Sequence, residues 1–132
     1  MATFFDASSL DLVLNDIKNS SDEVWLLDQY TQGDDWATVS ANKIASATLS
    51  GAGADFTGPT ASGNNRAISF DGKLGGTANT DSTLAQLHIA LVDTVNSTIM
   101  ACTDETSNQP ITNGNTVDFP AFNMTMNQPT QA

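Results

Sequence analysis

The sequence is poor in the side chains that catalyse reactions or hold metal ions. It contains one cysteine, Cys102, and one histidine, His88. A single cysteine excludes a disulfide within the chain, and these counts exclude a metal site built from clustered histidines and cysteines. A Ser-His-Asp triad would depend on His88, which lies in an apolar stretch with no nucleophile motif such as G-x-S-x-G. We therefore expect both residues to be structural and the protein not to be an enzyme.

Cationic side chains and long apolar runs are also scarce. The chain carries 15 acidic residues against 4 cationic ones, a formal net charge of −11. Such a charge repels phosphate backbones and anionic lipid, so we expect neither nucleic acid nor a membrane as a partner. No apolar run approaches the roughly 18 to 20 residues of a membrane span. No segment resembles a secretion signal, so we expect a soluble protein that is not exported by a conventional signal.

Motifs for cofactors and metal ions are missing as well. No stretch reads G-x-x-x-x-G-K, which would cradle phosphates, and none matches the D-x-[DN]-x-[DN]-G calcium loop. We therefore predict no cofactor and no metal site. A calcium ion held in a loop by Asp34, Asp35 or the pair Asp104 and Glu105 is a minor alternative.

Two short apolar stretches, His88–Val92 and Thr98–Cys102, predict a hairpin around which the rest of the fold is arranged. Both are rich in β-branched and medium apolar residues and are too short for independent helices. Between them, Asp93 favours an Asx-turn and Asn96 tolerates a left-handed conformation. Apolar residues at both alternating sets of positions indicate that the first strand is buried on both faces. We predict an antiparallel hairpin over Leu87–Cys102, central in the fold.

An amphipathic helix is predicted near the start of the chain, over about residues 8–19. Ser8 is the expected N-cap, with Asp11 three residues later as in a capping box. The apolar stripe has the spacing i, i+3, i+4, i+7 and consists of Leu10, Val13, Leu14 and Ile17. We expect this stripe to pack on the domain's own sheet. A second, short helical turn, capped by Asp34 or Asp35, is expected to carry Trp36 and Val39.

Further strands are predicted over residues 23–27, 44–49, 66–70 and 117–126. A long loop is expected between Ser50 and Asn65, because the segment holds four glycines and Phe56 as its only large apolar side chain. Asp71 and Gly72 predict a tight turn, and Pro120 predicts an edge position or a bulge. The sequence therefore predicts a single, mainly β domain over residues 1–132. We expect a β-sandwich or small barrel of about six or seven strands, one N-terminal α-helix and a flexible tail over residues 127–132.

The hairpin sequence LHIALVDTVNSTIMAC resembles a pattern in small proteins encoded among the head genes of tailed bacteriophages. In that family a strand ending in A-[LIV]-V-D precedes a T-x-N-S turn and a second apolar strand, which Ala90–Ser97 match. Asn113–Thr116 resembles the family's G-N-T turn, and Ala121–Met124 resembles its A-F-[DN]-[IM] segment. Val24–Tyr30 departs from the family, whose strand there often carries a cysteine and a Gln-Glu-Pro exit. The matching motifs are turns and core strands, so they transfer no catalytic residue.

This resemblance implies a virion structural protein, namely a decoration or cement protein on the capsid exterior that ties major capsid proteins together. The implied partners are the major capsid protein and further copies of the chain itself. The expected capsid contacts are Phe4, Phe5, Trp36, Phe56, Pro59 and Pro120. Two alternatives stay open. One is a head-to-tail connector or tail-associated virion protein, and the other is a carbohydrate-binding adhesion module in which Trp36 or Tyr30 stacks on a sugar ring.

Overall fold

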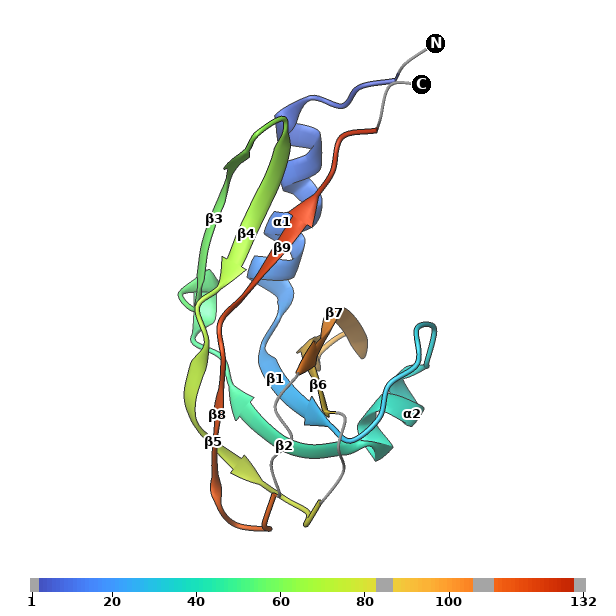
Figure 1. Ribbon diagram of the computed structural model, residues 1–132, viewed down its shortest axis with the longest axis vertical. Coiled ribbons are helices and arrows are strands. Elements are labelled where there is room, and N and C mark those ends of the chain that lie inside the picture. Colours follow the sequence, from blue (N-terminus) through green and yellow to red (C-terminus); the bar gives the residue numbers. More distant parts are fainter. Residues whose placement is uncertain (1–2, 83–86, 106–110, 130–132) are drawn as a thin grey trace.

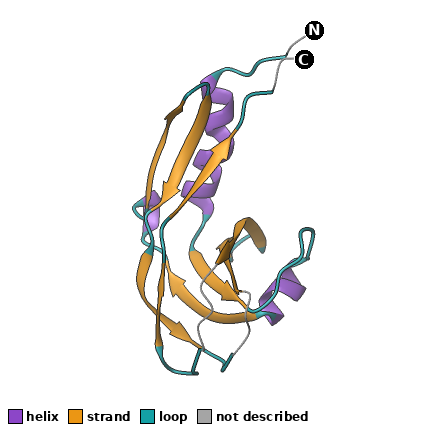
Figure 2. Ribbon diagram, viewed as in Figure 1, coloured by secondary structure: helices purple, strands orange, loops and turns teal. Residues whose placement is uncertain are grey.

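Two antiparallel β-sheets and an N-terminal helix make up the fold (Figure 1, Figure 2). The computed structural model describes residues 3–82, 87–105 and 111–129. Its elements are α1 (Ala7–Ser20), β1 (Glu23–Leu27), α2 (Trp36–Ala41), β2 (Lys43–Thr48), the 3₁₀ turn η1 (Gly51–Gly53), β3 (Phe56–Ser62), β4 (Asn65–Phe70), β5 (Lys73–Ala78), β6 (Leu87–Asp93), β7 (Thr98–Glu105), β8 (Thr116–Phe119) and β9 (Phe122–Met126). The predicted fold class is confirmed. The arrangement is sandwich-like, and the larger sheet does not close into a barrel.

The described residues form nine strands, more than the sequence predicts. The larger sheet has the order β7-β6-β1-β2-β5-β8, and the smaller one has the order β3-β4-β9. Three differences account for the higher count. β3 lies in the predicted loop, β5 lies in a segment for which no strand is predicted, and the strand predicted over residues 117–126 is divided between the two sheets.

A long, kinked two-stranded ribbon joins the two sheets. β4 leads directly into β5 and β8 leads into β9, while β4 pairs with β9 and β5 pairs with β8 (Figure 1). The ribbon bends where Asp71 and Gly72 lie opposite Pro120. The prediction of a tight hairpin turn at Asp71 and Gly72 is therefore wrong, because the strands on either side pair with other strands and not with each other. Pro120 lies between two edge strands, β8 and β9, so its predicted edge position is confirmed.

β1 and β6 are the doubly covered strands of the larger sheet. Four of the five residues of β1, Val24–Leu27, are buried, and β6 is buried at all positions except His88. The predicted hairpin exists, with Ala90 opposite Cys102, and burial of its first strand on both faces is confirmed. Its predicted central position is right for β6 but wrong for β7, which is an edge strand.

The turn between β6 and β7 is organised by Asp93, as predicted. Its carboxylate accepts hydrogen bonds from the backbone N–H groups of Val95 and Asn96, at 3.0 and 3.1 Å, and from the Asn96 side-chain amide at 2.7 Å. These bonds lower the pKa of Asp93. The left-handed residue is Ser97, with φ of 54°, and not Asn96.

Helix α1 covers one face of the smaller sheet. Its N-cap is Asp6, whose carboxylate accepts a hydrogen bond from the Ser8 backbone N–H at 3.0 Å, so the prediction of Ser8 as N-cap is wrong. A helix started by Asp6 gains one residue at its beginning, and Ser8 serves as the donor in the cap. Leu10, Leu14 and Ile17 are buried as predicted.

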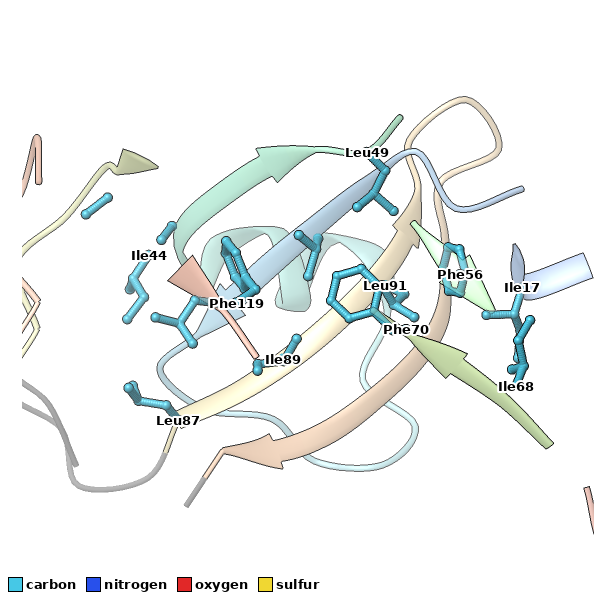
Figure 3. Packing of buried hydrophobic residues seen from close by; sticks show 14 of the residues in the cluster. Ile17, Ile44, Leu49, Phe56, Ile68, Phe70, Leu87, Ile89, Leu91 and Phe119 are labelled. Carbon is cyan, nitrogen blue, oxygen red and sulfur yellow. The ribbon is translucent and has the colours of Figure 1, made fainter. Parts of the chain in front are cut away.

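The residues buried beneath α1 continue into the larger sheet as one apolar core. Phe56 and Phe70 from the smaller sheet, with ring centroids 5.6 Å apart, lie in the same cluster as Leu91 and Phe119. Figure 3 shows Phe70 and Phe119 among side chains of the larger sheet, with Ile17 and Ile68 beside Phe56. One core thus connects the two sheets.

A second apolar cluster lies on the opposite face of β1 and β6. It is covered by α2, which Asp35 caps by accepting a hydrogen bond from the Thr38 backbone N–H at 2.8 Å. Val39 is buried in this cluster, and Trp36 packs on Trp25 with ring centroids 5.0 Å apart. The predicted short helix carrying Trp36 and Val39 is confirmed, with Asp35 as its cap.

The prediction of a long loop between Ser50 and Asn65 is wrong. The segment forms η1 and β3, and β3 pairs with β4 along an antiparallel hairpin. Two features hold this glycine-rich segment in place. Phe56 is buried in the core, and the Lys18 ammonium of α1 donates a hydrogen bond to the Gly58 carbonyl oxygen at 3.0 Å.

Candidate interaction surface

The N-terminal arm, residues 3–6, is fastened to the segment that follows β9. The Gln128 side-chain amide accepts a hydrogen bond from the Phe5 N–H at 3.0 Å and donates one to the Phe5 carbonyl oxygen. The Gln128 backbone N–H donates to the Asn65 side chain at 2.8 Å. One side-chain amide thus pairs with the Phe5 backbone much as a neighbouring strand would. Within the predicted flexible tail, residues 127–129 are therefore held against the domain, and residues 130–132 lie outside the described residues.

These contacts bring three distant parts of the sequence to one end of the molecule. Figure 1 shows residues 3–6 and 127–129 running side by side beyond the start of α1, next to the turn between β3 and β4. We call this end, residues 3–6, 62–65 and 126–129, the apical surface. Phe4 and Phe5 are 64% and 50% exposed there. Exposed aromatic side chains of this size are typical of protein contact surfaces.

Two hollows flank the N-terminal arm. The tip hollow, of about 700 Å³, is lined by Phe4, Ser62, Gly63, Asn64, Asn65, Gln128 and Pro129. The helix groove, of about 270 Å³, is lined by Phe5, Ser9, Leu10, Val13 and Met126. The tip hollow is rich in amides, whereas the helix groove is apolar apart from Ser9.

All four cations of the chain are engaged within the fold. Arg66 pairs with Asp11 at 2.7 Å, which raises the pKa of the guanidinium, and Lys73 pairs with Asp55 at 3.2 Å. Lys18 donates to the Gly58 carbonyl oxygen, and the Lys43 ammonium lies 4.7 Å from the centre of the Trp25 ring. The charge offered to a partner is therefore mainly carboxylate. Next to Phe5, hydrogen bonds from Ser8 lower the pKa of Asp6, which favours its carboxylate form.

The six residues expected to contact a capsid do not gather in one place. Phe4 and Phe5 lie together on the apical surface, while Trp36 is half-buried on α2 and Pro120 is exposed at the ribbon kink. Pro59 is half-buried in β3. Phe56 is 7% exposed and belongs to the core, which leaves little of its ring accessible to a partner.

Other residues in or near the apical surface gave no sequence signal of function. Val13 belongs to the apolar stripe that was expected to be buried, but it is 46% exposed because it lies at the border of the covered face. Gln128 lies in a polar tail, and its role depends on the N-terminal arm more than a hundred residues away along the chain. Leu12 is 70% exposed, because it lies outside the apolar stripe of α1.

The described residues contain no arrangement typical of nucleophilic catalysis. The His88 ring nitrogen Nδ1 lies 2.7 Å from a carboxylate oxygen of Asp104, and Cys102 is on the same face of the neighbouring strand. Burial, together with the charge of Asp104, raises the pKa of the Cys102 thiol to about 11, which disfavours the thiolate. Among the side chains described, no group of three His, Cys, Asp or Glu residues is placed to hold a metal ion.

Comparisons with known proteins return no relative. No protein-family model, no curated protein and no solved structure matches this chain. None of the helices within the described ranges has the length and apolar character to cross a bilayer. Inference about function therefore rests on the fold, on the apical surface and on the motifs in the sequence.

Proposed function

We propose that this protein is a decoration, or cement, protein of a tailed-bacteriophage capsid, bound to the outer surface of the major capsid protein lattice. The observation that carries the proposal is the apical surface, where exposed Phe4 and Phe5 are held on an acidic domain whose cations are all engaged internally. The resemblance of the β6–β7 hairpin sequence to proteins encoded among phage head genes is the reason for proposing a phage capsid as the partner. In this proposal the chain acts by binding and performs no chemical step.

Charge supports a position on the outside of the shell. A net charge of −11 repels packaged DNA, whereas a protein lattice tolerates it. Further copies of the chain are then neighbours on the lattice and not tight partners, because each copy carries the same excess of carboxylates.

Cementing follows from mass action. A protein that binds only the assembled lattice stabilises it by about 2.7 kcal/mol per site when its free concentration is a hundred times Kd. Repetition of this gain over many sites makes disassembly of the head progressively less favourable. Modest affinity at each site is therefore sufficient.

The alternatives receive less support from the geometry. A carbohydrate-binding module would use Trp36 or Tyr30 as a stacking platform, but Trp36 packs on Trp25 and the Tyr30 ring lies 6.2 Å from that of His88. A connector or tail-associated role uses the same exposed surface and differs in copy number. Location within the particle distinguishes it from cementing.

The first test is quantitative mass spectrometry of purified virions combined with imaging of the particles. We expect copies in proportion to the capsid subunits, located on the outer shell. Copies confined to one vertex or to the tail would favour the connector alternative, and absence from virions would refute both.

A variant lacking residues 1–5 tests the role of the apical surface in the same assay. The deletion retains the Asp6 helix cap, so we expect thermal unfolding close to that of the wild type and loss of capsid occupancy. Leu74→Ser is the control, because Leu74 is 78% exposed on β5, away from the apical surface. Unchanged occupancy of the truncated protein would remove Phe4 and Phe5 from the interface.

A further inference from the structure

The helix groove has the size and chemistry of a socket for one protein side chain. It lies between the N-terminal arm and α1, with walls formed by Phe5, Val13 and Met126. Its volume of about 270 Å³ lies just below the range of about 300–1,000 Å³ that is usual for small-molecule pockets. The lining offers no convergent set of polar groups to orient a small ligand. A large apolar side chain fits this description better.

The groove leaves apolar surface in contact with water. Phe5 is 50% exposed and Val13 is 46% exposed, because β9 ends at Met126 and nothing in the described chain covers them further. Apolar surface gains free energy when it leaves water, at about 25 cal/mol per Å². A partner that fills the groove therefore gains this contribution without any rearrangement of the helix.

Two carboxylates belong to residues next to those that line the groove. Asp6 is adjacent to Phe5 and caps α1, and Asp16 lies one helical turn beyond Val13 on the same side of the helix. Arg66 is the cross-strand neighbour of Met126, but its guanidinium donates to both carboxylate oxygens of Asp11, at 2.7 and 3.1 Å. The groove thus has an apolar lining with carboxylates on the residues beside it, which we call its negative rim.

We propose that the helix groove docks a basic, apolar segment of another protein, whose large apolar side chain enters the groove while flanking Lys or Arg residues meet Asp6 and Asp16. Electrostatic complementarity of this kind selects the partner and speeds association. A second copy of the chain is disfavoured, since a symmetric contact would place two negative rims against each other. Identification of the segment as part of the major capsid protein rests on the proposed function above.

The test measures binding of the purified protein to heads that lack it, assembled from the major capsid protein of the same phage. Val13→Asp and Val13→Lys both remove the apolar wall, and they introduce opposite charges. Val95→Asp and Val95→Lys are matched controls, because Val95 is 84% exposed in the turn between β6 and β7. In this turn the Thr94 N–H donates a hydrogen bond to Asp22, which follows the C-terminal end of α1, so the turn lies at the opposite end of the helix from the groove. Val13→Ala removes the same contact with a residue of higher helix propensity, so impaired folding cannot explain its effect.

We expect Val13→Asp to raise Kd at least about tenfold and Val13→Ala to raise it about threefold to tenfold. Val13→Lys should bind more weakly than Val13→Asp, because it repels a basic partner. The Val95 controls should remain within about twofold of the wild type.

The possible negative results distinguish between the proposed function, the role of the groove and the basic character of the partner. Wild-type protein that does not bind the heads refutes the proposed function and, with it, the capsid partner of the groove. Wild-type binding with Val13 variants equal to their Val95 controls refutes the groove alone. Equal binding of Val13→Lys and Val13→Asp refutes a basic partner. A dimer of the free protein that the Val13 variants dissociate would assign the groove to a second copy.

Discussion

Phe56 shows how one side chain anchors an otherwise polar segment. It is the only large apolar residue between Ser50 and Asn65, and it is 7% exposed beside Phe70. Composition alone makes this segment look like a loop. Burial of this ring in the common core, together with the hydrogen bond from Lys18 to Gly58, helps to hold β3 next to β4.

Replacement of Phe56 tests this anchoring. Phe56→Ala should lower the free energy of unfolding by about 3–5 kcal/mol, because it removes a buried ring and leaves a cavity. Urea denaturation measures the change. Phe4→Ala is the control and should stay within about 0.5 kcal/mol, since Phe4 is 64% exposed. A small effect of Phe56→Ala would mean that β3 is held by its backbone bonds alone.

The ionisation of Asp93 makes the stability of the folded protein depend on pH. Hydrogen bonds from Asn96 and Val95 lower its pKa in the folded chain, so the folded state binds this proton less readily than the unfolded state. The stability that it contributes is complete above the unfolded pKa of about 3.9 and is lost as the pH falls through the lower folded value.

Asp93→Asn removes this titration. At neutral pH the variant should be less stable than the wild type, because an amide oxygen is a weaker acceptor than a carboxylate. The difference should shrink as the pH falls below about 4. Thermal unfolding of both proteins over a pH series measures it, and a difference that stays constant with pH would contradict the role of the charged carboxylate.

At the scale of elements, the kink of the β4–β5 and β8–β9 ribbon joins the two sheets. Gly72 has φ of +88°, and a Cβ at this position would lie 2.9 Å from the Phe119 carbonyl oxygen and 3.3 Å from the Ala121 nitrogen. The ribbon therefore requires glycine for two reasons, its left-handed conformation and the close approach of the opposite strand.

Gly72→Ala should destabilise the protein more than replacement of a glycine that is required only for its left-handed conformation. Gly63 is the matched control, with φ of +61° and nothing within 4 Å of an added Cβ. We expect Gly63→Ala to cost about 1–2 kcal/mol and Gly72→Ala to cost about 1–3 kcal/mol more. Equal losses in urea denaturation would mean that the kink relaxes to accept the methyl group.

Prediction of the helices and strands succeeded where residue type and periodicity within a short window determine the element. It failed where pairing with a distant segment determines it. β1, α1 and the β6–β7 hairpin follow from residue type and periodicity within short windows. The Asp71–Gly72 pair predicts a tight turn because that motif usually joins two strands that pair with each other. Here the partners are β8 and β9, more than forty residues away, which no local pattern reveals.

At the scale of the whole molecule, the acidic excess opposes folding. The two described Lys and Arg ion pairs, Arg66 with Asp11 and Lys73 with Asp55, neutralise only part of the 15 acidic side chains. Net charge far from zero destabilises a compact state through self-repulsion, and salt screens that repulsion.

Added salt should therefore stabilise the protein. Raising NaCl from about 0.01 to 0.2 M shortens the screening length from about 30 Å to below 10 Å, and we expect the unfolding temperature to rise by a few degrees. Differential scanning calorimetry measures the shift. The effect should largely disappear near pH 4, where many carboxylates are protonated. A fall in unfolding temperature with salt at neutral pH would mean that the internal ion pairs outweigh the repulsion.

The candidate site was only partly predictable. Phe4 and Phe5 stand out in the sequence as an apolar pair outside any periodic segment, and both are exposed at the apical surface. Val13 and Met126 looked like ordinary members of a buried stripe and a half-buried strand. Their exposure beside Phe5 depends on where the sheet ends relative to the helix.

Local pattern was sufficient for the mainly β class, for the N-terminal helix and for an acidic surface, because propensity, periodicity and charge act over a few neighbouring residues. Tertiary structure alone decided the pairing of β3 with β4, the kinked ribbon, and the meeting of the N-terminal arm with Gln128. Those features depend on which distant segments the common core brings together, and contacts of that kind leave no periodic trace in the segments that make them.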